Sequence, residues 1–87
     1  MSINYKIREQ LPSDAVVFDN HAYDNSIIGI SLDGRAIYDF DKMVKELMMD
    51  ECWEETDAIE WISYNTLRAL PYAGEKRPLV VYGDEYL

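Results

Sequence analysis

The dipeptide Asp33-Gly34 constrains the fold more than any other feature of the sequence, because it stands between the apolar-rich runs 27–32 and 35–39. A two-residue Asp-Gly connection favours a β-hairpin with a type I′ turn, whose two central positions both need positive φ. The resulting register pairs Ile30 with Ile37. Side chains alternate between the faces of a strand, so this register sets the core face. That face would carry Ile28, Ile30, Leu32 and Ile37.

The residues directly after the hairpin predict an amphipathic helix. Asp39 can act as its N-cap, and apolar side chains follow at the i, i+3, i+4, i+7, i+8 spacing of one helix face. These are Phe40, Met43, Val44, Leu47 and Met48. Tyr38 and Met43 also occupy the N′ and N4 positions of a hydrophobic staple, which fixes how the chain enters a helix.

A second amphipathic helix is predicted farther on, ending near Pro71 and Gly74. Its apolar positions span an arc of about 120° at about 100° per residue. They are Ala58, Ile59, Ile62, Thr66, Ala69 and Leu70. The run Pro78–Tyr82 then predicts a closing strand, in which proline is acceptable only at the start or on a sheet edge.

The first part of the chain adds a further strand and a loop. Residues 15–19 (AVVFD) are typical of a short strand, and the Asn/Asp-rich residues 20–26 favour a loop. Residues 1–12 are weakly patterned and predict an arm or an edge strand. We therefore expect residues 1–87 to form a single α+β domain with the order β-β-β-α-α-β. It would be a two-layer sandwich with two helices on one face of a mainly antiparallel sheet.

Charge limits the partners that the chain can have. It carries 17 acidic against 8 basic side chains, a net charge of −9. This charge repels nucleic-acid phosphates and anionic lipid head groups, and it attracts a basic protein surface such as a nucleic-acid channel. A solvated surface that only keeps the protein soluble is the alternative. No apolar run is long enough to span a membrane and no leader pattern is present, so we expect a cytoplasmic protein.

The acidic run 50–60 and the helix behind it form the candidate partner-binding surface. Trp, Tyr and Arg dominate protein interfaces, and Arg68 stands four residues from both Tyr64 and Tyr72, within reach of their rings. Packing at the edge of the core is the competing explanation, and we expect Trp61 to be mostly buried. The predicted partner-binding residues are Trp61, Tyr64, Arg68, Tyr72, Asp50, Glu51, Glu54, Glu55 and Asp57.

No catalytic residue, cofactor site or metal site is predicted. An oxygen-rich segment with Asp19, Asn20, His21, Asp24 and Asn25 lacks the spacing of an EF-hand. His21 and Cys52 are the chain's single histidine and single cysteine, too few for structural zinc. Acidic neighbours also disfavour a thiolate at Cys52. No carboxylate pair is set apart by apolar surroundings, so we expect a protein that is not an enzyme.

Three segments carry a family resemblance: YDNSIIG (23–29), DGRAIYDFDKMV (33–44) and YNTLRALPY (64–72). Over about residues 15 to 82 the chain resembles a set of small uncharacterised acidic proteins from anaerobic gut-type bacteria, their phages and mobile elements. Members carry a serine ahead of the second helix, where this chain has Glu54. The family has no established activity. Its setting implies an inhibitor of a nucleic-acid-handling host protein, a DNA mimic of the anti-CRISPR or anti-restriction kind. The alternative is a structural or self-associating domain, such as a homodimer, without an inhibitory role.

Overall fold

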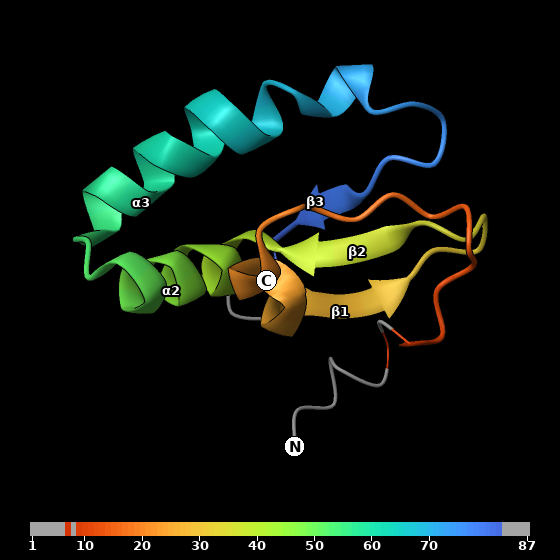
Figure 1. Cartoon of the computed structure of the whole chain (residues 1–87), viewed down its shortest axis with the longest axis horizontal. Helices are drawn as coiled ribbons and strands as arrows, with labels where there is room; N and C mark the ends of the chain where they lie inside the picture. Colours follow the sequence, from red (N-terminus) through yellow and green to blue (C-terminus); the bar gives the residue numbers. More distant parts are fainter. Residues whose placement is uncertain (1–6, 8, 83–87) are drawn as a thin grey trace.

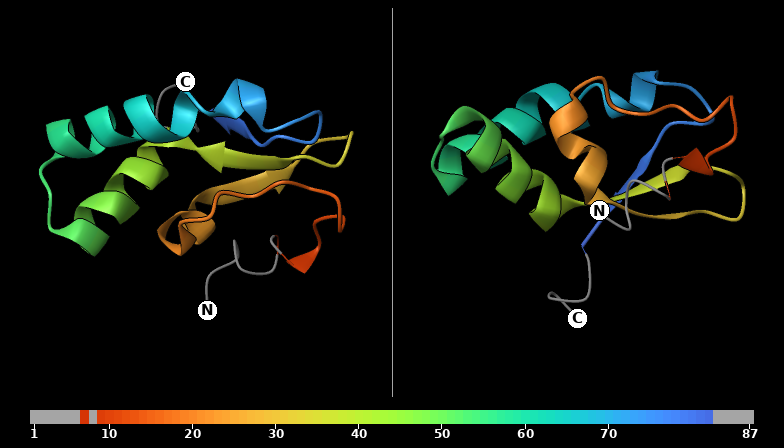
Figure 2. Two further views of the ribbon diagram at one scale, coloured as in Figure 1. Left: turned by 45° about the horizontal axis from the view of Figure 1, so that its top comes forward. Right: turned by 60° about the horizontal axis from the view of Figure 1, so that its bottom comes forward.

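A three-stranded mixed sheet lies at the centre of the computed structural model, which describes residue 7 and residues 9–82. Strand β1 (Ile27–Ile30) pairs antiparallel with β2 (Ala36–Asp39), and β2 pairs parallel with β3 (Leu79–Val81). Helix α2 (Phe40–Glu51) runs on from the end of β2 (Figure 1). Helix α3 (Glu55–Trp61) and the helical turns after it form a layer above the sheet (Figure 2). The α+β class is confirmed, with the order β-β-α-α-β in the described residues. The sheet is mixed rather than mainly antiparallel as predicted, because β3 joins it parallel to β2.

The hairpin between β1 and β2 is present, but its register differs by one residue from the prediction. Ile30 pairs with Ala36 rather than with Ile37. The Gly34 N–H donates to the Ser31 carbonyl at 2.9 Å, and Gly34 alone in the loop has positive φ, at 84°. The connection is therefore a three-residue loop, a type I turn followed by a left-handed glycine. The Ser31 Oγ supports it by accepting the Arg35 N–H at 2.9 Å.

This one-residue difference moves Ile37 off the buried face of β2 and places Ala36 and Tyr38 on it, opposite Ile30 and Ile27 of β1. Ile27, Ala36 and Tyr38 are fully buried, whereas Ile28 and Leu32 are exposed. A bulge between Ile27 and Gly29 adds to the change of face. The predicted core face, which comprised Ile28, Ile30, Leu32 and Ile37, is therefore wrong; Ile30 and Ile37 are only half-buried.

Asp39 joins β2 to α2 without a loop. It is the last residue of β2 and is only 3% exposed. Its Oδ1 accepts the N–H groups of Asp41 and Lys42 at 2.9 and 3.3 Å, which confirms the predicted N-cap. The predicted apolar face of the helix is also confirmed. Met43, Val44 and Leu47 are buried, and Phe40 and Met48 pack half-buried against the core.

Helix α2 ends in a left-handed turn at Cys52, with φ 58° and ψ 40°. The N–H groups of Cys52 and Trp53 both donate to the Met48 carbonyl, the second at 3.2 Å. This turn reverses the chain, so that α3 begins three residues later and packs against α2. Glycine or asparagine usually occupies such a position, because a Cβ atom is crowded there.

The second predicted helix is confirmed, but its second half is a π-helix. Helix α3 continues into η2 (Ile62–Leu67) and then the 3-10 turn η3 (Leu70–Tyr72). A π turn bonds residue i to i+5 and so changes the phase of the helix. As predicted, Ala58 and Ile62 are buried and Ile59, Thr66 and Leu70 half-buried, but Ala69 is exposed and Leu67 packs against the core instead.

Residues 15–26 differ from the prediction. Residues 15–19 form no strand; they cross Tyr38, whose hydroxyl accepts the Phe18 N–H at 3.2 Å, with the two rings 4.6 Å apart. The predicted loop contains a 3-10 helix, η1 (His21–Ser26), whose first turn is capped by Asn20 Oδ1 at 3.0 Å from the Ala22 N–H. Helix η1 packs against α2 and buries Tyr23.

Of the elements predicted at the two ends of the chain, the closing strand is confirmed. The closing strand is present as β3, paired with β2. Residues 9–12 form no strand, while residues 1–6 and 8 of the predicted arm lie outside the described residues.

The left-handed cysteine allows a test of the α2–α3 turn. Replacement of Cys52 by glycine should raise the free energy of unfolding by about 0.5–1 kcal/mol, because the crowded Cβ is removed and only part of this gain is offset by unfolded-chain entropy. Urea denaturation under reducing conditions measures the change. Cys52→Ala is the control, since it removes the thiol but keeps the Cβ. Equal stability of the glycine and alanine variants would contradict the described turn.

The buried ring of Tyr23 predicts a loss of stability in alkali. Burial raises the pKa of Tyr23 above its ordinary value of 10.0, and the Thr66 side chain opposes part of this rise. Above about pH 10 the unfolded chain therefore loses this proton before the folded chain does, so stability falls as pH rises and is unaffected by this group below about pH 10.

Urea unfolding between about pH 7 and about pH 11 measures this loss. Tyr23→Phe should flatten the decline, whereas Tyr72→Phe, at a tyrosine that is 89% exposed, should leave it as in the wild type. Identical declines for wild type and Tyr23→Phe would show that Tyr23 is not buried in this way.

Candidate functional site

The six carboxylates of the acidic run all lie at the surface. Asp50 and Glu51 stand at the end of α2, whereas Glu54, Glu55, Asp57 and Glu60 lie at the start of α3 and along it. The sequence has no basic residue between Lys45 and Arg68. Within the described residues, no ion pair joins any of the six to a basic side chain. The negative charge of this surface is therefore not neutralised by neighbours.

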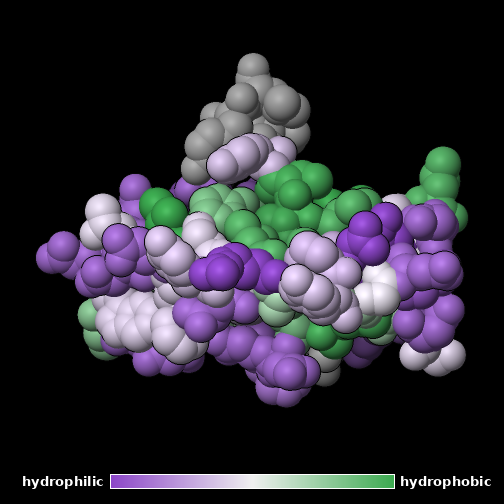
Figure 3. Space-filling model, turned by 90° about the horizontal axis from the view of Figure 1, so that it is seen from above, coloured by the Kyte–Doolittle hydropathy of each residue, from purple (hydrophilic) through white to green (hydrophobic). Residues whose placement is uncertain are grey.

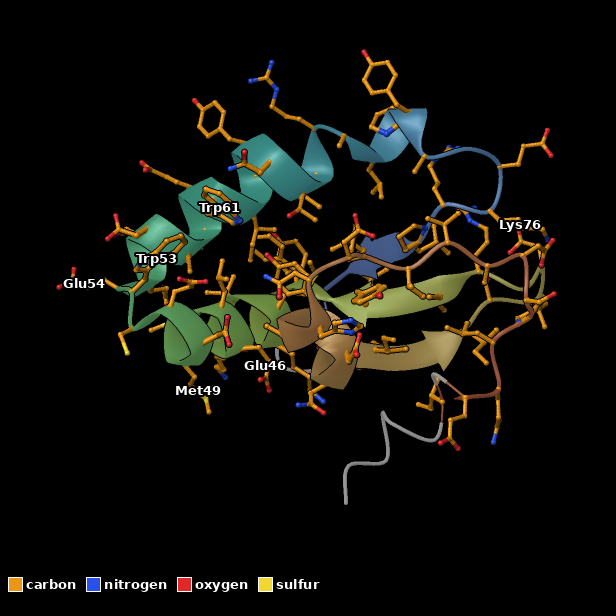
Figure 4. All side chains as sticks on the ribbon, in the orientation of Figure 1. Glu46, Met49, Trp53, Glu54, Trp61 and Lys76 are labelled. Carbon is orange, nitrogen blue, oxygen red and sulfur yellow. The ribbon has the colours of Figure 1, made fainter. Side chains whose placement is uncertain are left out.

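The chain's two tryptophans lie next to each other along α3 (Figure 4). Trp53 precedes the N-cap residue Glu54, and Trp61 is the last residue of α3. Their ring centroids are 5.6 Å apart with an interplanar angle of 62°, the edge-to-face geometry that aromatic pairs prefer. The pair forms part of an open cleft of about 360 Å³, which we call the Trp cleft. It is lined by Trp53, Asp57, Glu60, Trp61, Tyr64 and Asn65.

Local backbone geometry positions both tryptophans. The left-handed turn at Cys52 places Trp53 at the N′ position of α3, where an apolar residue commonly packs on the first helical turn. Trp53 is half-buried and packs against the core. The Asn65 Nδ2 donates to the Trp61 carbonyl at 3.1 Å, which ties the end of α3 to the π turn.

The expectation that Trp61 is mostly buried is wrong, because its exposed fraction is 45%. Trp53 packs on the edge of the core that Trp61 was expected to cover, and Trp61 contacts the Trp53 ring instead. Half of a large aromatic ring system is thus left open to solvent beside the carboxylates.

The remaining predicted aromatic and basic residues lie farther along the same helical segment. Tyr64 is 66% exposed, and the Arg68 guanidinium carbon lies 5.7 Å from its ring centroid, within the range of a cation–π contact. This confirms one of the two predicted contacts of Arg68. Tyr72 stands on η3, is 89% exposed, and makes no cation–π contact with Arg68 in the described structure.

The structure brings together only part of the predicted set. Asp57, Trp61 and Tyr64 line the Trp cleft, and Arg68 adjoins it through Tyr64. Glu55 lines a different cleft. Asp50, Glu51 and Tyr72 lie outside the Trp cleft.

Three residues of the cleft were not predicted as binding residues: Trp53, Glu60 and Asn65. For Trp53 the sequence holds a usable signal, because an apolar residue immediately before a helix N-cap tends to fold back onto the first turn. Glu60 belongs to the acidic run, but its place beside Trp61 follows only from the helix.

Two larger clefts lie beside the same helical segment. The first, of about 650 Å³, lies between α2, α3 with η2, and β3; its mainly apolar lining includes Val44, Leu67 and Val80, together with Glu55. Apolar residues gather in the middle of the view in Figure 3, beside the more hydrophilic surface at the left where α3 lies. The second, of about 530 Å³, lies between residues 16–20 and η2 and shares Trp61 and Asn65 with the Trp cleft.

The oxygen-rich segment shows one side-chain pair. His21 Nδ1 and Asp24 Oδ2 are 3.2 Å apart. In the part of the chain that the structure describes, no three His, Cys, Asp or Glu side chains are grouped to hold a metal ion. None of its helices is long and apolar enough to cross a membrane.

Compared with models of known protein families, with curated proteins and with solved structures, the chain shows no match. The family resemblance therefore stays a prediction.

The N-cap of α3 gives a test of how this surface is built. Glu54 occupies the cap position but its side chain makes no capping hydrogen bond. A serine hydroxyl can accept an N–H of the first turn, so Glu54→Ser should stabilise the fold by about 0.5–1 kcal/mol. Glu54→Gln removes the same charge without supplying a good cap. If chemical denaturation gives both variants the same stability, Glu54 is not the N-cap.

Proposed function

We propose that this chain is a non-enzymatic binding protein that docks the acidic, aromatic surface of α3 on a basic surface of another protein. The observation that supports this most is the unneutralised set of six exposed carboxylates beside the half-open Trp61 ring. The helix dipole favours Glu55 and Asp57, which lie in the first turn of α3. The other carboxylates repel these and one another, and a basic partner would relieve that repulsion.

The two kinds of residue would have separate roles. Negative charge steers a basic partner and raises the association rate, over a range of about 8–10 Å at physiological salt. Exposed aromatic rings contribute most of the affinity once the surfaces meet, because they bury a large area at small entropic cost. Trp61 and Tyr64 are the anchors, and Arg68 and Tyr72 lie farther along the chain, after η2 and on η3.

The charge spacing on α3 resembles that of a nucleic-acid strand. Glu54, Asp57 and Glu60 follow one another at three-residue intervals on one side of α3, which at about 1.5 Å per residue is about one charge per 4.5 Å of helix axis. A single DNA strand carries about one charge per 3.4 Å. The proposed partner is therefore a protein that handles nucleic acid, and the proposed activity is inhibition by occupying its nucleic-acid channel. The resemblance to proteins of phages and mobile elements favours the same proposal, in a cytoplasmic setting.

Self-association is the second candidate, and the apolar cleft beside β3 favours it. A second copy would cover this cleft and complete a homodimer without an inhibitory role. The net charge of −9 opposes such a contact through repulsion. Light scattering over a range of concentrations separates the candidates, because a monomer at every concentration excludes the dimer.

Charge reversal tests the proposed function. The wild-type chain should capture a basic partner from extract of its host, block that partner's binding to DNA, and associate more slowly as salt rises from about 50 to about 300 mM. Glu54→Lys with Glu55→Lys should lower the association rate at least about tenfold, since steering of this kind contributes about 10- to 1,000-fold.

The control is Glu9→Lys with Asp14→Lys, which makes the same change in net charge at two exposed residues away from α3. This control variant should associate with the partner at close to the wild-type rate. A captured partner whose DNA binding is unaffected, or whose association is insensitive to salt and to the α3 variant, would rule out the DNA-mimic proposal.

A further inference from the structure

The Trp cleft has the size and walls of a receptor for one side chain. Its volume of about 360 Å³ lies at the lower end of the roughly 300–1,000 Å³ that small-molecule sites span. Trp53 and Trp61 meet edge to face, and both line the cleft (Figure 4). Trp61, at 45% exposed, has ring surface left to bury.

The charges around the cleft select a cation. Asp57 and Glu60 stand three residues apart on α3 and therefore lie on the same side of the helix. Both are exposed, and in the described structure neither forms an ion pair with a basic side chain. The face of an aromatic ring also carries negative potential. The aromatic rings and the carboxylates thus both favour a positively charged ligand.

The geometry favours a guanidinium over an ammonium group. Guanidinium is planar and weakly hydrated, stacks on aromatic rings, and binds carboxylates through two parallel hydrogen bonds. Arg68 already contacts the Tyr64 ring in this way, with its guanidinium carbon 5.7 Å from the ring centroid, so a partner's guanidinium would use the two indole rings. Asp57 and Glu60 outnumber the positive charge of Arg68. Asn65 donates its amide nitrogen to Trp61, which leaves its amide oxygen as an acceptor for an added N–H donor.

We infer that the Trp cleft receives one arginine side chain of a protein partner. The ring faces of the tryptophans stack on the guanidinium, and Asp57 and Glu60 accept its N–H groups. The proposed partner is a protein, so the occupant is an arginine within a polypeptide. This inference rests on the proposed function and names the contact at its centre.

Two peptides of equal charge test the inference: acetyl-Gly-Arg-Gly-Arg-Gly-amide and its lysine counterpart, titrated into the ¹⁵N-labelled chain at low salt. The chain has only two tryptophans, so their two indole N–H signals report on the cleft directly. The arginine peptide should shift both indole signals and bind about two- to fivefold more tightly than the lysine peptide. Binding without displacement of the indole signals would place the peptide elsewhere.

Variants separate ring stacking from charge. Trp61→Leu keeps every charge and should reduce the affinity for the arginine peptide to that for the lysine peptide. Tyr82→Leu, at an exposed aromatic residue outside the Trp cleft, should change neither affinity. Asp57→Asn with Glu60→Gln should weaken the binding of both peptides and remove the preference for the arginine peptide. Asp50→Asn with Glu51→Gln removes the same charge from the end of α2 and should keep that preference. Thermal unfolding checks that each variant is folded, and the carboxamide pair gives a reading even if Trp61→Leu is not.

The outcomes distinguish the inference from the proposed function. Equal affinity for both peptides, unchanged by Trp61→Leu, overturns the arginine receptor but leaves the charge-dependent docking of α3 standing. Absence of binding by either peptide also overturns the receptor. The proposed function is overturned by a different result: the captured partner associates equally fast with the wild-type chain and with the variant that carries Glu54→Lys and Glu55→Lys.

Discussion

Three elements meet at Asp39, and the rest of the structure depends on this joint. Asp39 ends β2, pairs in register with Val81 of β3, and caps α2 with a buried carboxylate. A buried carboxylate is costly unless it is hydrogen-bonded, so the helix must begin at this residue. Its direction then brings the buried face of α2 against Tyr23 and Tyr38 in one core. The turn at Cys52 follows at a fixed distance along α2 and sets where Trp53 and α3 lie.

The features that could be predicted from the sequence are those determined by nearby residues. The cap at Asp39, the buried face of α2 and the closing strand depend on side-chain type and spacing over a few positions. The hairpin register does not, because the Ser31 hydroxyl bonded to the Arg35 N–H supports a three-residue loop where the Asp-Gly signal favours a two-residue one. Residues 15–19 have the composition of a strand, but they contact the Tyr38 side chain rather than a strand edge. The π turn after Trp61 likewise departs from any regular helical period.

The residues of the candidate site likewise fall into those that could be predicted from the sequence and those that could not. Its acidic residues and its exposed Tyr64 and Arg68 are visible in the sequence, since charge runs and helical spacing are local properties. The contact between Trp53 and Trp61 is not, because Trp53 stands before the helix and reaches Trp61 only through a left-handed residue that is not glycine. That turn converts an ordinary acidic surface into a cleft with aromatic walls. The proposed docking function and the proposed arginine receptor both depend on it.

The central physical claim is that cations accumulate at α3 more than anywhere else on the described surface. Paramagnetic broadening of NMR signals by a cationic nitroxide, compared with a neutral nitroxide of the same shape, measures local potential residue by residue without any partner. We expect the largest excess broadening by the cationic nitroxide at the indole N–H groups of Trp53 and Trp61 and at the amides of residues 54–61. Excess broadening spread evenly over the chain, or greatest at β1 or η1, would contradict it.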